Sequence, residues 1–72
     1  MKSTLTKRQS EVLEFIKKYI NTNGYPPSVR EIARGINLRS PATIHFHLNK
    51  LENLNYIKRE PSKTRAITVL NW

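Results

Sequence analysis

Hydrophobic residues recur every three or four positions over the first third of the chain. In residues 7–23 the apolar side chains fall on one stripe of about 160°, which predicts an α-helix packed on one side. These side chains are Val12, Leu13, Phe15, Ile16, Tyr19 and Ile20. Thr6 followed by Gln9 three residues later has the pattern of a capping box at the start of this helix. Gly24 follows as a natural helix stop.

A second, shorter helix is predicted for residues 29–35. The segment before it, Tyr25-Pro26-Pro27, must be extended because proline disfavours helical backbone at the preceding residue. Ser28 and Glu31 have the spacing of another capping box, with Ser28 as the cap. The helix is expected to end near Gly35, and Asn37 beyond it tolerates the left-handed backbone that a tight turn needs.

The third predicted helix covers residues 41–54. Ser40 is its cap, and Pro41 occupies the first helical position, where proline is favoured. Ile44, Leu48 and Leu51 are spaced i, i+4 and i+7, so they share one face and are expected to point into the core.

After this helix the hydrophobic period changes from that of a helix to that of a strand. Residues 56–60 and 66–70 are predicted strands, and the polar segment 61–65 is the turn between them. Ile67 and Val69 point to one side of the second strand, while Ala66 and Thr68 point to the other. The predicted fold class is therefore mostly α with a small β-hairpin. It is a three-helix winged helix-turn-helix that forms a single domain over residues 1–72.

The composition of the chain indicates a polyanionic partner. The 72 residues carry 13 Lys and Arg against 5 Asp and Glu, a net charge of +8. A surplus of this kind favours binding to phosphates. The chain has no cysteine and no apolar run of about 20 residues, so we expect a cytoplasmic protein without a membrane span. The sequence has no glycine-rich phosphate loop, and nothing in it marks an activated nucleophile. It therefore gives no indication of an enzyme, a cofactor or a small-molecule substrate.

The outer face of the third helix is the candidate base-reading surface. Residues near the start of such a helix meet base edges in the major groove of DNA. Side chains that can hydrogen-bond to bases alternate here with small or apolar ones. The candidates are Ser40, Ala42, Thr43, His45, Phe46 and Asn49. The alternative is a merely solvated face, with Phe46 packed against the wing.

Basic residues around this helix are the candidate contacts to the DNA backbone or minor groove. They are Arg30, Arg39, Lys50, Lys58, Arg59, Lys63 and Arg65. Ordinary surface charge is the alternative reading, above all for Arg30 on the second helix. His45 and His47 do not suggest a metal site, because residues two apart on a helix point about 200° away from each other. His47 is expected at the edge of the core.

Several segments together resemble one known family. Gly24–Ile32 resembles the linker and second helix of the LexA repressor family, and Ser40–Leu48 resembles its recognition helix in Gram-positive bacteria. Leu51-Glu52, Tyr56-Ile57 and Pro61–Ile67 match its wing. The resemblance implies a bacterial transcriptional repressor of the SOS response to DNA damage. Such a repressor binds palindromic operators as a dimer and is associated with the nucleoid when bound.

In that family the outer face of the third helix reads bases, which here implies Ala42, Thr43, His45 and Phe46, with Ser40 at its start. Arg65 matches a wing arginine that touches the DNA backbone.

The family's second domain, which carries the Ser-Lys self-cleavage site and the main dimer contacts, has no counterpart before Trp72. The chain is therefore expected to be either an excised DNA-binding domain or a stand-alone relative, with no self-cleavage and at most a weak homodimer on DNA. Two alternatives stay open: a stand-alone winged-helix regulator of a phage or mobile element, and a winged helix that binds protein or RNA.

Overall fold

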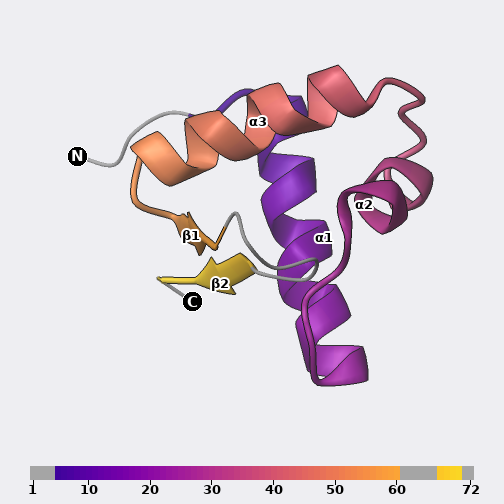
Figure 1. Ribbon diagram of the computed structural model, residues 1–72, viewed down its shortest axis with the longest axis vertical. Helices are drawn as coiled ribbons and strands as arrows, with labels where there is room; N and C mark the ends of the chain where they lie inside the picture. The colour runs from indigo at the N-terminus through magenta and orange to yellow at the C-terminus, as the bar shows by residue number, and fades with distance from the viewer. Residues whose placement is uncertain (1–4, 61–66, 71–72) are drawn as a thin grey trace.

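Three helices and a β-hairpin follow one another along the chain, in the predicted order. The computed structural model describes residues 5–60 and 67–70 (Figure 1). The elements are α1 (Lys7–Asn23), α2 (Val29–Gly35), α3 (Pro41–Asn53), β1 (Ile57–Arg59) and β2 (Ile67–Val69). The predicted turn 61–65, with Lys63 and Arg65, lies outside the described residues, as do Ala66 and Trp72. Within the described part of the chain, no helix is long and apolar enough to cross a membrane.

Side-chain caps fix where the first two helices begin. Thr6 Oγ1 accepts a hydrogen bond from the Gln9 N–H at 3.1 Å, and Gln9 Oε1 accepts one from the Thr6 N–H at 3.2 Å. Ser28 and Glu31 repeat this reciprocal pair at 3.2 and 2.8 Å. Each pair satisfies backbone donors that a helix leaves without an internal partner. Both predicted capping boxes are confirmed.

Residues with left-handed backbone form the turns after α1 and α2. Gly24 ends α1 with a φ of 82°, and its N–H bonds to the Ile20 carbonyl at 2.8 Å. Asn37 has a φ of 61°, the conformation predicted for it in the turn between α2 and α3. Asn tolerates this region better than most side chains, so the chain can turn here without glycine.

The end of α3 and both strands differ slightly from their predicted ranges. α3 ends at Asn53 instead of residue 54, because Leu54 has left the helical conformation at φ −89° and ψ 5°. Asn55 follows with a φ of 65°, so the chain turns there and β1 begins at Ile57 instead of residue 56. β1 and β2 are antiparallel over three residue pairs, with Lys58 opposite Thr68. Glu60 and Leu70 lie outside these pairs.

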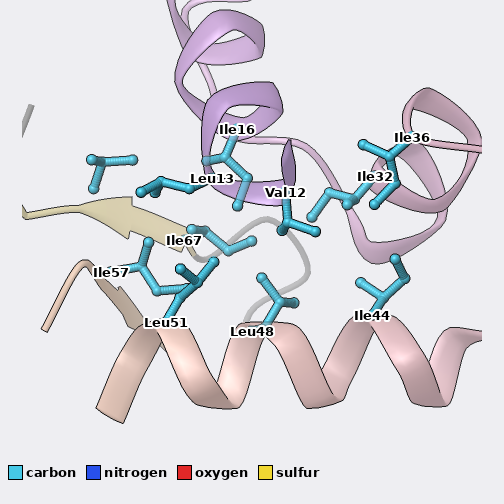
Figure 2. Packing of buried hydrophobic residues seen from close by; sticks show 11 residues of the cluster. Val12, Leu13, Ile16, Ile32, Ile36, Ile44, Leu48, Leu51, Ile57 and Ile67 are labelled. Carbon is cyan, nitrogen blue, oxygen red and sulfur yellow. The ribbon is translucent and has the colours of Figure 1, made fainter. Parts of the chain in front are cut away.

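One hydrophobic cluster joins every element. Figure 2 shows α3 directing Ile44, Leu48 and Leu51 toward side chains of α1 above it, with the hairpin at one end and α2 at the other. The buried members are Val12, Leu13, Ile16, Ile32, Ile36, Ile44, Leu48, Leu51, Ile57, Ile67 and Val69. Burial of both Ile67 and Val69 beside an exposed Thr68 confirms the predicted alternation of β2. A two-stranded hairpin is marginal alone, so the packing of β1 on α3 and the burial of the strand side chains in this cluster stabilise it.

Candidate nucleic-acid interface

The two faces of α3 are sharply different. Ile44, Leu48 and Leu51 are completely buried, as the spacing of the apolar residues predicts. On the opposite side α3 exposes a row of residues at i, i+3, i+4 and i+7, called here the outward face. Its members are Ala42, His45, Phe46 and Asn49. Because α3 packs along its other side on α1, α2 and β1, this packing sets the direction of its outward face.

Phe46 gives the outward face an unusual apolar component. Its side chain is 60% exposed, the most exposed of the large hydrophobic residues in the described part of the chain. The ring makes an edge contact with the His47 imidazole, with 5.6 Å between the ring centroids. Phe46 therefore points to solvent beside the hydrogen-bonding groups of His45 and Asn49.

The amino-terminal end of α3 is also exposed. Ser40 Oγ accepts a hydrogen bond from the Thr43 N–H at 3.3 Å and so caps the helix as predicted. The hydroxyl group of Ser40 retains its proton for a further donor contact. Arg39, one residue earlier, is exposed, whereas Thr43 is half-buried. Unpaired backbone N–H groups at a helix start attract anions, and Arg39 reinforces that charge.

Arg8 in α1 holds the turn that orients α3. Its Nη1 donates to the Ile36 carbonyl at 3.2 Å and also contacts Glu11 Oε1 at 2.9 Å. The Ile36 carbonyl lies at the end of α2, immediately before Asn37. Nothing in the sequence pattern indicated this contact, because 28 residues separate its two partners.

Each carboxylate of α1 and α3 lies within 4 Å of a basic side chain. Glu52 is the only acidic residue of α3, and its Oε1 is 3.1 Å from Arg59 Nε. On α1, Glu11 pairs with Arg8, and Glu14 lies 3.9 Å from the Lys17 ammonium group. An unpaired carboxylate would repel the phosphates of DNA. The acidic residues of α1 and α3 therefore weaken the binding of a polyanion only slightly.

Arg59 connects the hairpin to the outward face. Besides its ion pair with Glu52, Arg59 donates through Nη2 to the Asn49 side-chain oxygen. The Arg59 side chain is only 23% exposed. Two of its donor groups are thus engaged within the protein, a role that sequence reasoning did not find. Spacing on α3 alone placed Asn49 correctly on the outward face but could not reveal its partner on β1.

The other predicted backbone contacts are spread over three elements. Arg30 on α2, Lys50 on α3 and Lys58 on β1 are all exposed. Lys63 and Arg65 lie outside the residues that the structure describes. Together with Arg39, these exposed residues distribute positive charge over α2, α3, β1 and the segment before α3.

His47 lies under the interface and not on it. It is 8% exposed, and its Nδ1 has no hydrogen-bond partner. Burial, together with the nearby positive charge of Arg8, lowers the pKa of His47 below its ordinary value of 6.5. Both effects favour the neutral imidazole, and the location of His47 at the core edge agrees with the sequence prediction. Among residues 5–60 and 67–70, no cluster of three possible metal ligands occurs.

These features define the chain as a winged helix-turn-helix, in which α2 and α3 form the helix-turn-helix and β1 and β2 belong to the wing. A family described as the LexA DNA binding domain matches residues 2–66. The chain belongs to this family.

Curated relatives agree along almost the whole chain. A protein named LexA repressor from Caldicellulosiruptor saccharolyticus is 55% identical over 71 residues, which cover 99% of this chain and 35% of that protein. LexA repressors of Staphylococcus epidermidis and Staphylococcus aureus are 54% and 52% identical over 67 residues, covering 93% of this chain and 32% of each protein. The chain thus spans about a third of the length of these relatives.

Proposed function

We propose that this chain binds double-stranded operator DNA through the outward face of α3 and thereby represses transcription. The observation that carries the proposal is a helix packed on the core along one side, whose exposed face presents His45, Phe46 and Asn49 and no unpaired carboxylate. Such a helix fits the major groove, where His45 and Asn49 can hydrogen-bond to base edges. Ala42 and Phe46 can make apolar contacts with thymine methyl groups.

Affinity would come mainly from phosphate contacts. The exposed cations on α2, α3, β1 and the segment before α3 are Arg30, Arg39, Lys50 and Lys58, and Lys63 and Arg65 add to them in the sequence. Each neutralised phosphate releases condensed counterions, so affinity should fall steeply with salt. Six such contacts correspond to a loss of about 10³ in affinity between about 50 and 200 mM salt.

The relatives are named LexA repressors, and the proposal extends to a palindromic operator in the SOS response. One chain would cover one half-site, and two chains would need half-sites about one helical turn, or a multiple of it, apart. The proposal places the chain in the bacterial cytoplasm and gives it no catalytic role and no small-molecule substrate. If the chain were instead a regulator of a phage or mobile element, it would bind DNA by the same chemistry but recognise a different operator.

Binding to a palindromic duplex, a random duplex and a single-stranded RNA, each titrated against salt, tests the proposal. The palindrome is first selected by the chain from a randomised duplex library. DNA repression predicts a steep negative salt slope and a clear preference for the selected palindrome. Equal affinity for all three nucleic acids would overturn the operator proposal, and stronger binding to RNA would favour an RNA-binding winged helix.

Two matched substitutions separate base reading from backbone binding. His45→Ala should flatten the preference at one base-pair position, because it removes a hydrogen-bonding group from the outward face. Lys58→Ala should weaken binding to every duplex about equally and reduce the salt slope by about one. Both residues are exposed, so neither change should alter folding. The assignment of base reading to His45 and backbone binding to Lys58 would be contradicted if Lys58→Ala flattened the base preference and His45→Ala left it unchanged.

A further inference from the structure

Three side chains from two elements form a connected network at the carboxyl-terminal half of α3. Arg59 on β1 donates from Nε to Glu52 Oε1 at 3.1 Å and from Nη2 to Asn49 Oδ1. Asn49 and Glu52 are three residues apart, on adjacent turns of α3. Glu52 holds the guanidinium by an ion pair, and the planar guanidinium then presents its Nη2 to Asn49 in a defined direction.

This network decides which way the Asn49 amide faces. Arginine has only donor groups and no acceptor. The amide of Asn49 must therefore turn its oxygen to Arg59, which leaves its NH₂ group outside this contact. An asparagine free to rotate offers both an acceptor and a donor. Asn49, which is exposed at the end of the outward face, offers mainly a donor.

The donor character of Asn49 has a direct consequence in the major groove. Adenine is read by asparagine through two bonds, one in which the amide oxygen accepts from N6 and one in which the NH₂ donates to N7. Guanine presents two acceptors, N7 and O6, thymine presents O4, and cytosine presents only a donor. An amide oxygen directed to Arg59 cannot also turn to adenine N6 without leaving Arg59, whereas the NH₂ group can still donate to N7 or O6 of guanine, so the held amide matches guanine best.

We propose that Arg59, held by Glu52, is a positioning residue that fixes the Asn49 amide as a donor and so makes α3 select guanine over adenine at one operator position. The inference rests on the proposed function and specifies the base preference of that same surface. It also gives Arg59 a role in specificity, in contrast to the backbone contact that the sequence suggested for it.

Selection from a randomised duplex library, followed by sequencing, tests this role with the full chain and its variants. Asn49→Ala identifies the base-pair position that Asn49 reads, as the position at which the preference disappears. At that position the unsubstituted chain should favour guanine over adenine by about tenfold, as expected for one good base contact. Arg59→Leu frees the amide oxygen and should reverse the preference toward adenine at the same position and at no other.

Two controls separate positioning from charge and from folding. Lys58→Leu removes the same charge from the neighbouring position of β1 and should lower affinity without changing the base preference. Arg59→Leu added to Asn49→Ala should cause no further change at the identified position, because Arg59 acts there only through Asn49. A change of preference in this double variant would show direct reading by Arg59 and overturn the inference.

A second measurement does not depend on how Arg59→Leu folds. Nuclear magnetic resonance of the Asn49 side-chain NH₂ group should report an ordered amide in the unsubstituted chain and a mobile one in Glu52→Gln, where the ion pair with Arg59 is lost. An equally mobile amide in both proteins would overturn the inference. If the unsubstituted chain selects no duplex at all, the proposed function itself fails. If it selects an operator and Arg59→Leu keeps guanine, only this inference fails.

Discussion

Gly35, the last residue of α2, lies against the ring of Phe15 on α1, and this contact sets the distance between the two helices. A methyl group added at Gly35 would be 2.1 Å from Phe15 Cε1 and 2.4 Å from Phe15 Cζ. Ordinary contacts between carbon atoms are about 3.5–4.0 Å. Gly35→Ala therefore forces the Phe15 ring or the end of α2 to move.

The free energy of unfolding should fall by about 1–2 kcal/mol in Gly35→Ala. Overpacking of this kind costs about 1–3 kcal/mol. Alanine recovers at most about 1 kcal/mol through its better helix propensity, and less at the last helical position. For a domain of this size the loss corresponds to a decrease in Tm of about 4–16 °C.

Phe15→Ala shows whether the ring is the cause. In that background Gly35→Ala should cost less than about 0.5 kcal/mol, so the two substitutions should be coupled by about 1–2 kcal/mol. Gly24→Ala is a matched control, because Gly24 has a φ of 82° and no atom within 4 Å of an added methyl group. It should cost about 1–2 kcal/mol through backbone conformation alone, with or without Phe15.

Urea unfolding followed by circular dichroism measures all of these free energies. The reasoning is refuted if Gly35→Ala costs the same in both backgrounds, or if it raises stability while Phe15 is present.

Three other substitutions probe the core and the turn. His47→Leu should remove a pH dependence. Burial and Arg8 lower the pKa of His47 in the folded state, so the unfolded chain takes up the proton first as the pH falls, and the stability present above about pH 6.5 is lost. Urea unfolding between pH 7.5 and 5 measures this loss. The control variant His45→Ala should keep it. Leu48→Ala, at a fully buried position, should cost about 2–5 kcal/mol and abolish DNA binding by unfolding the chain, as circular dichroism would show. Asn37→Gly should change the free energy of unfolding by less than about 0.5 kcal/mol in the same assay. Asn37→Val should lower it by about 1–2 kcal/mol, because the φ of residue 37 is 61°.

Local chemistry made most of the fold predictable. The capping boxes at Thr6 and Ser28 involve partners three residues away, so the sequence around each helix start contains all the information needed. The stop at Gly24 and the turn at Asn37 are equally local. The buried side of α3 follows from the spacing of Ile44 and the leucines after it, since one helix face must cover the core.

Contacts between distant segments were not predictable in this way. The bond from Arg8 to the Ile36 carbonyl and the bond from Arg59 to Asn49 each join different elements. Helical periodicity places Asn49 on the outward face but contains no information about which strand residue approaches it. The exact end of α3 also depended on the conformation of Leu54, for which the apolar pattern gives no signal.

The two faces of α3 share no residue, and this separation bears on how such proteins diversify. Stability resides in Ile44, Leu48 and Leu51, whereas Ala42, His45 and Phe46 are exposed and make no contribution to the buried cluster. Substitutions at these exposed positions can accumulate at nearly constant folding free energy, so a lineage can acquire new operators without passing through unfolded intermediates. Asn49 differs because β1 holds it, and evolutionary change there would have to be accompanied by change at Arg59.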